Sequence, residues 1–142
     1  MTVLHAGLVA MRQGAAWRGA LITGRSGAGK SDLMLRALSA GLKLVADDRT
    51  LVWPSGGRAY GRAPEALSGL VEARGLGVLS HSALPLAEVA LVVACEAPDA
   101  EIERMPPEAD RLAVAGLDVP LIRVHAFEAS AVSKLRLALE RP

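Results

Sequence analysis

Residues 24–31 decide the fold of this chain, and they read Gly24-Arg25-Ser26-Gly27-Ala28-Gly29-Lys30-Ser31. They match the pattern G-x-x-x-x-G-K-[ST] at every fixed position. Glycines carry no Cβ, so the backbone can turn tightly and aim successive N–H groups at an anion. The segment therefore predicts a phosphate-binding loop whose eight residues all lie against the phosphates of a nucleotide.

The last two residues of this loop carry its chemistry. Lys30 supplies a positive charge for the β- and γ-phosphates, and the Ser31 hydroxyl is placed to bind Mg²⁺. We therefore expect a nucleotide and Mg²⁺ as cofactors.

The segments on either side have the order that the motif requires. Residues 19–23 are short and apolar, as in a buried strand, and apolar residues recur at helical spacing from Leu33 to Leu38. Gly41 stands where the glycine that ends a helix belongs. The sequence thus predicts a strand, the loop, and a helix over residues 30–40.

Composition limits the class of protein. With 142 residues, 51% of them hydrophobic, we expect one globular domain over 1–142. Aromatic residues are few, so Ala, Leu and Val must build the core. A net charge of +1 without a basic block argues against a nucleic-acid partner.

Nothing in the sequence indicates a membrane or an oxidising compartment. We find no apolar run of membrane-spanning length and no signal peptide. Cys95 is the sole cysteine, so it cannot form an internal disulfide, and its apolar surroundings predict a small core residue. We expect a cytoplasmic protein.

The remaining pattern is that of an α/β domain with a mixed sheet. Strands are predicted over 3–10, 42–46, 89–95, 111–114 and 121–124, a hairpin over 50–60, a short helix over 64–67, a glycine-broken segment over 70–80, a surface loop over 98–108 and a helix over 129–139.

Acidic residues separate the classes of phosphate-loop protein. Asp47 and Asp48 follow a predicted strand, at the sheet edge where α/β proteins bind ligands. One carboxylate could hold the water shell of the metal, and the other could accept a proton from an attacking hydroxyl. Because neighbouring side chains on a strand alternate, we expect only one to face the phosphates. Glu96 also ends an apolar strand and is the rival acid.

Two further residues carry weaker signals. Glu72 precedes the glycine-rich turn Arg74-Gly75-Leu76-Gly77, and His5 lies on the first predicted strand. Taken alone, the turn is unspecific and the histidine is an ordinary structural residue.

Four segments together resemble the catalytic domain of HPr kinase/phosphorylase. That family has a strand beginning with His, then L-I-T-G-x-S-G-x-G-K-S, G-x-x-L-V-A-D-D and E-x-R-G-L-G. Here these correspond to His5 and to residues 21–31, 41–48 and 72–77. The resemblance implies a P-loop fold of the phosphoenolpyruvate-carboxykinase type.

The resemblance also implies an activity. The family transfers the γ-phosphoryl group of ATP to a serine of HPr, the small phosphocarrier of the sugar phosphotransferase system, and thereby regulates carbohydrate metabolism. It also runs a reverse reaction in which inorganic phosphate attacks phosphoserine. Asp48 would be the base, Lys30 would stabilise the transferred group, and His5 would be the catalytic histidine of the first strand. Ser31 and Glu72 would lie at the metal.

The match is weaker toward the C-terminus. The arginine-bearing motif P-V-R-P-G-R-N is not recognisable in residues 120–127, where Arg123 is the loose candidate. We therefore expect a short form of the family that favours the kinase direction. By resemblance it forms a homo-oligomer, a hexamer.

Two other functions fit a phosphate loop. One is a small-molecule kinase, for which residues 98–111 are long enough to form a lid. The other is a non-catalytic sensor in which the nucleotide merely orders a loop.

Overall fold

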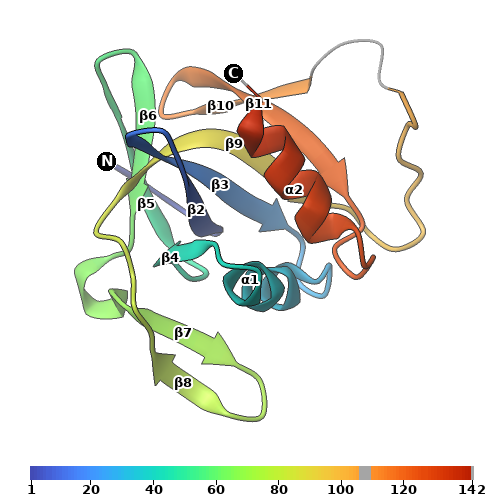
Figure 1. The fold of residues 1–142 in the computed structure, drawn as a ribbon, viewed down its shortest axis with the longest axis horizontal. Coiled ribbons are helices and arrows are strands. Elements are labelled where there is room, and N and C mark those ends of the chain that lie inside the picture. Colours follow the sequence, from blue (N-terminus) through green and yellow to red (C-terminus); the bar gives the residue numbers. More distant parts are fainter. Residues whose placement is uncertain (106–109, 142) are drawn as a thin grey trace.

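The computed structural model describes residues 1–105 and 110–141, and Figure 1 shows a curved sheet with α-helices packed on it. The elements in chain order are β1 (Thr2–Leu4), β2 (Gly7–Gln13), β3 (Ala16–Gly24), α1 (Lys30–Ser39), β4 (Lys43–Ala46), β5 (Thr50–Ser55), β6 (Arg58–Arg62), the 3₁₀ helix η1 (Glu65–Leu67), β7 (Leu70–Ala73), β8 (Gly77–Ser80), β9 (Ala87–Cys95), β10 (Asp110–Val114), β11 (Leu117–Val124) and α2 (Ala131–Glu140).

The main sheet is mixed, as the sequence predicts. Its order is β1-β5-β6-β9-β3-β2-β4. β11 pairs with the later part of β9 and carries β10 as its antiparallel partner. β9 runs parallel to β3 and β11, whereas the hairpins β2–β3, β5–β6 and β10–β11 are antiparallel.

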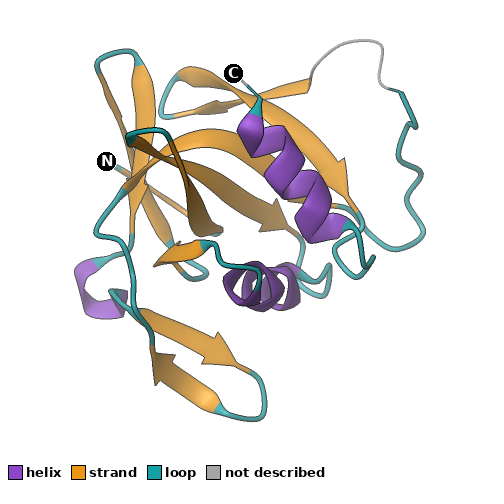
Figure 2. Cartoon of the chain, viewed as in Figure 1, coloured by secondary structure: helices purple, strands orange, loops and turns teal. Residues whose placement is uncertain are grey.

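Alternating residues on the central strands fill two separate cores. Val9 and Ile22 point to the face that carries α1 and α2, and their neighbours Leu8 and Leu21 point to the opposite face. The helices add Leu33, Met34, Ala37, Ala131, Leu135 and Leu139 to the first core. Both α-helices therefore lie on one side of the sheet (Figure 2). The small aliphatic residues that the composition indicates do build these cores.

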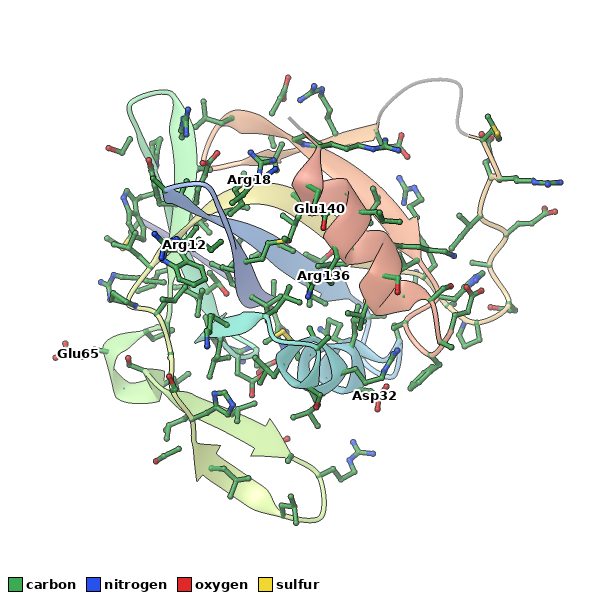
Figure 3. The ribbon with its side chains drawn as sticks, in the orientation of Figure 1. Arg12, Arg18, Asp32, Glu65, Arg136 and Glu140 are labelled. Atoms are coloured by element: carbon green, nitrogen blue, oxygen red, sulfur yellow. The ribbon has the colours of Figure 1, made fainter. Side chains whose placement is uncertain are left out.

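Arginine side chains fix α2 in place (Figure 3). Arg18 Nε, on β3, donates to the carbonyl of Leu139 over 3.0 Å. Arg136 Nη1, on α2, donates to the carbonyl of Ala40 at the end of α1 over 2.9 Å. The last helix is thereby tied both to the sheet and to the helix that follows the glycine-rich loop.

The prediction of one strand over residues 3–10 is wrong. The chain bends at His5 and Ala6, because β1 pairs with β5 while β2 pairs with β3 and β4. The buried hydroxyl of Thr50 donates to the carbonyl of Ala6 over 2.8 Å and holds this bend. Strand propensity alone could not indicate the change of partner.

The glycine-broken segment 70–80 forms the hairpin β7–β8, a two-stranded sheet that projects from the main body (Figure 1). The other predicted elements appear with small shifts. α2 begins at Ala131 rather than at residue 129, and β11 begins at Leu117. The expected loop 98–108 is irregular over 98–105, and its residues 106–108 lie outside the described residues.

Candidate functional site

Four strands end at the same edge of the sheet. β3, β9 and β11 run parallel, and their last residues Gly24, Cys95 and Val124 lie in register. β4 has the same direction, because both β3 and β4 pair antiparallel with β2. The glycine-rich loop therefore leaves the middle of this edge, with the aspartates on one side of it and the segments after β9 and β11 on the other. Ligands of α/β proteins bind at such an edge.

The glycine-rich loop needs its glycines. Gly24, Gly27 and Gly29 have φ angles of 150°, 84° and 94°. L-residues rarely adopt such positive values. Gly29 is also the N-cap of α1, and a Cβ there would lie 2.9 Å from the Cβ of Ala126. The loop thus delivers the N-terminus of α1, with its free N–H groups, to the sheet edge.

One pocket collects the residues that the sequence singled out. Lys30 and Ser31 reach it from the first turn of α1, and Asp47 and Asp48 reach it from the end of β4. The bend before β2 completes the wall. The lining residues are Ala6, Gly7, Lys30, Ser31, Met34, Asp47 and Asp48.

Both aspartates line this pocket, whereas strand alternation predicted that only one would face the phosphates. Both lie beyond the end of β4, where strand alternation no longer applies. Asp48 has a φ of 65°, the left-handed region that Asp tolerates better than most residues. This backbone turn brings both carboxylates to the same pocket.

His5 lies beside Asp48. Its Nε2 is 2.7 Å from Oδ1 of Asp48, and Arg49 Nη1 is 3.4 Å from Oδ2. The pair is more than half exposed, so a substrate can reach it. Since Thr50 holds the bend that carries His5, the structure fixes this histidine next to the candidate base.

Asp47 connects the pocket to the projecting hairpin. Its Oδ2 accepts a hydrogen bond of 2.9 Å from the backbone N–H of Glu72 on β7. Burial raises the pKa of Asp47, and the charges of Asp48 and Glu72 raise it further, although the N–H of Glu72 lowers it. Asp48 and Glu72 are therefore close enough to repel the carboxylate of Asp47, and a cation would relieve that repulsion.

The oxygen donors present suit a hard cation. Mg²⁺ prefers oxygen ligands and is usually held by one or two carboxylates together with substrate phosphates. Among residues 1–105 and 110–141, no group of three His, Cys, Asp or Glu side chains is arranged to hold a metal alone. The Ser31 hydroxyl and the two aspartates around one pocket fit a cation that shares its ligands with a nucleotide.

The rival acid, Glu96, lies on the other side of the loop. Arg123 Nη1 is 2.7 Å from Glu96 Oε1, and Arg123 Nε is 3.2 Å from Oδ2 of Asp110. These carboxylates raise the pKa of Arg123. Glu96 lines a second cavity that does not include Lys30 or Ser31.

Cys95 is buried where β9 meets the loop, as the sequence predicts. Burial raises the pKa of its thiol to about 11, although the charges of Lys30 and Arg36 lower it. The thiolate is the reactive form of cysteine, and a raised pKa keeps the thiol protonated. Cys95 therefore packs against the loop and does not act as a nucleophile.

Sequence reasoning singled out Glu96 but missed the other functional candidates around the second cavity. His125 and Phe127 stand outside any motif, and Arg36 reads as an ordinary helix residue. For His125 and Phe127 the available signal was their position just after a predicted strand, because side chains at the ends of parallel strands gather at one edge.

Neither α-helix within the described residues is long and apolar enough to cross a membrane.

Comparison with known proteins gives a consistent result. A family model described as the HPr serine kinase C-terminal domain matches residues 2–136. The HPr kinase/phosphorylase of Limosilactobacillus reuteri (strain DSM 20016) is 35% identical over 116 residues, which cover 75% of this chain and 36% of the relative. That of Clostridium perfringens (strain SM101 / Type A) is 44% identical over 66 residues, covering 46% and 22%. The chain thus spans about a third or less of these curated relatives.

A solved structure shares the fold. The HPr(Ser) kinase/phosphatase from Coxiella burnetii aligns with a TM-score of 0.79 at 23% identity, covering 99% of this chain and 93% of that chain. The mixed α/β architecture is therefore that of a known HPr kinase structure. Because the family model matches nearly the whole chain, this protein belongs to the HPr serine kinase C-terminal domain family.

Proposed function

We propose that this protein is an ATP- and Mg²⁺-dependent kinase that phosphorylates a serine of an HPr-type phosphocarrier and so regulates the sugar phosphotransferase system. One observation carries the proposal. Lys30, Ser31, Asp47 and Asp48 line a single pocket, and His5 lies against Asp48. Family membership and the names of the relatives supply the substrate.

Each residue has a role that its position supports. The loop 24–31 binds the phosphates of ATP as a P-loop in a fold of the phosphoenolpyruvate-carboxykinase type, and Lys30 offsets the charge on the transferred group. Asp48 accepts the proton of the serine hydroxyl as the new O–P bond forms and the bond to the β-phosphate oxygen breaks, releasing ADP. His5 holds the Asp48 carboxylate in place and contributes a charge-stabilising hydrogen bond.

The metal would be held by Ser31 and Asp47, and Glu72, whose backbone N–H donates to Asp47, would contribute to its water shell. Mg²⁺ supplies charge neutralisation between the β- and γ-phosphates when it is bound. Asp47 is suited to this task because a cation beside it would offset the repulsion that Asp48 and Glu72 exert on its carboxylate.

Further properties follow from family membership as proposals. The protein forms a homo-oligomer, which is a hexamer in the family, and it is located in the cytoplasm. It also catalyses a reverse phosphorylase reaction that uses the same loop and the same Asp48. Folding of the whole chain as one unit over 1–142 is part of the same proposal.

The test uses the protein with radiolabelled ATP, Mg²⁺ and HPr, with HPr lacking its phosphorylatable serine as the matched control. We expect label on the serine-containing HPr alone. Transfer to a metabolite from a panel of hydroxyl compounds would instead identify a small-molecule kinase. Tight ATP binding without transfer to any acceptor would identify a nucleotide sensor.

A further inference from the structure

A second cavity opens on the side of the glycine-rich loop opposite the aspartates. Its volume is about 280 Å³. It is formed by the segments directly after β9 and β11, two strands that run parallel to β3 and end in register with it. The lining residues are Glu96, Pro98, His125, Ala126, Phe127 and Glu128.

Phe127 joins this cavity to the loop. A Cβ on Gly29 would lie 3.0 Å from Cζ of Phe127, so one edge of the ring lies against the N-cap of α1. Nevertheless, Phe127 is 61% exposed. A large aromatic ring is thus held beside the candidate phosphate site with much of its surface uncovered by the protein.

Arg36 fixes the segment that carries this ring. It donates to the carbonyl of Ala126 and, over 3.1 Å, to that of Glu128. Its Nε also donates to Oδ2 of Asp32, one turn earlier on α1, over 2.8 Å. The position of Phe127 is therefore set by the same helix whose first turn carries Lys30 and Ser31.

Hydrogen bonds and ion pairs also fix the walls of the cavity. His125 Nε2 donates to the carbonyl of Ala100 over 2.7 Å, which links the segment after β9 to the segment after β11. Glu128 is held by His125 and by Lys134, both at 3.1 Å. The two acids on its lining, Glu96 and Glu128, are paired with Arg123 and Lys134, so their charges are offset and the cavity suits an uncharged group.

We propose that this cavity binds the nucleobase of the nucleotide whose phosphates occupy loop 24–31, with Phe127 stacking on the base. The inference rests on the proposed nucleotide-dependent function and adds the place of the base to it. The cavity is close to the lower end of small-molecule sites, roughly 300 Å³, which suits one base with its sugar. Aromatic side chains accept any base on their faces, because every base has a π-face.

The test measures binding of two Mg²⁺-loaded ligands, ATP and inorganic tripolyphosphate, by titration calorimetry. Phe127→Leu keeps an apolar side chain but removes the aromatic face, and Phe127→Trp keeps that face. Leu137→Ala is the matched control, because Leu137 is 62% exposed on α2, outside the cavity lining. We expect Phe127→Leu to raise the Kd for ATP roughly 5- to 150-fold and to leave tripolyphosphate unchanged. Phe127→Trp and Leu137→Ala should bind both ligands like the original protein.

Two results would overturn the nucleobase site alone. Either Phe127→Leu binds ATP as tightly as the original protein, or it weakens ATP and tripolyphosphate equally, which would show that the ring merely supports the loop. Failure of the original protein to bind tripolyphosphate at all would overturn the phosphate loop as well. The tripolyphosphate titration of the unaltered protein therefore separates failure of the base site from failure of the proposed function.

Discussion

The Nε2 atom of His5 lies 2.7 Å from Oδ1 of Asp48, although 43 positions separate the two residues in the sequence. His5 precedes β2, and Asp48 follows β4, the strand that pairs with β2. The antiparallel pairing brings the start of one strand beside the end of the other. The contact is therefore a consequence of sheet topology, and it makes Asp48 and His5 a unit that can be tested by mutation.

Asp48→Asn should bind ATP normally and transfer phosphate roughly 10²- to 10⁴-fold more slowly, if Asp48 is the general base. Asn tolerates the left-handed backbone at this position, so the fold should persist. Single-turnover transfer to HPr is the measurement. Glu96→Gln is the matched control, because Glu96 also follows a strand at this edge but is paired with Arg123. A larger loss of transfer rate in Glu96→Gln than in Asp48→Asn would show that Glu96, and not Asp48, is the general base.

His5→Asn should slow transfer by up to about 100-fold, because it leaves the carboxylate of Asp48 free to rotate. If His5 acts through Asp48, the double variant His5→Asn/Asp48→Asn should be no slower than Asp48→Asn alone. The comparison is a double-mutant cycle on the transfer rate. Strictly additive losses would show that His5 has an independent role.

Lys30→Ala should abolish detectable transfer while the protein stays folded. The side chain lies in the first turn of α1, where a fixed cation offsets charge on the transferred group. Circular dichroism checks the fold, and labelled ATP checks the activity. Turnover close to that of the original protein would remove the basis for the phosphate loop.

Asp47→Asn should stabilise the metal-free protein while it impairs transfer. Burial raises the pKa of Asp47, so the folded state prefers its neutral form, and Asn can still accept the N–H of Glu72. For a carboxyl with a raised folded pKa, stability is fully present below the unfolded value of 3.8 and falls as the pH rises through the folded value.

The stability gain in Asp47→Asn should therefore be absent at pH 3 and present at pH 7. Thermal unfolding of both proteins in chelator at these two pH values measures it. A variant that is less stable at pH 7 would show that the charged carboxylate contributes to the fold.

Serine phosphorylation should be much faster than phosphate-driven dephosphorylation. The reverse reaction must hold inorganic phosphate in line with phosphoserine. Arg123, the loose candidate for the arginine of the C-terminal motif, is bound to Glu96 and Asp110 and does not line the Lys30 pocket. Pyrophosphate release from serine-phosphorylated HPr, compared with the forward rate, measures the bias. Equal rates in the two directions would show that another group holds the phosphate.

Local sequence was sufficient to predict those parts of the site whose geometry depends on a few neighbouring residues. Loop 24–31 needs glycines at fixed spacing before a helix, and that pattern predicted both the strand and α1 around it. The sequence likewise predicted that Asp47 and Asp48 follow a strand. The roles assigned to these residues remain predictions, because contact with a substrate tests them and geometry alone does not.

Only the tertiary structure decided which distant residues meet. The order of β9, β3, β2 and β4 placed His5 and both aspartates on one side of the loop, and Glu96 with Phe127 on the other. Sequence carries no direct record of this, because strand pairing depends on packing between segments far apart in the chain. Identical local patterns, an acid after an apolar strand, therefore ended in two different environments: Asp48 beside His5 and the Lys30 pocket, and Glu96 bound to Arg123.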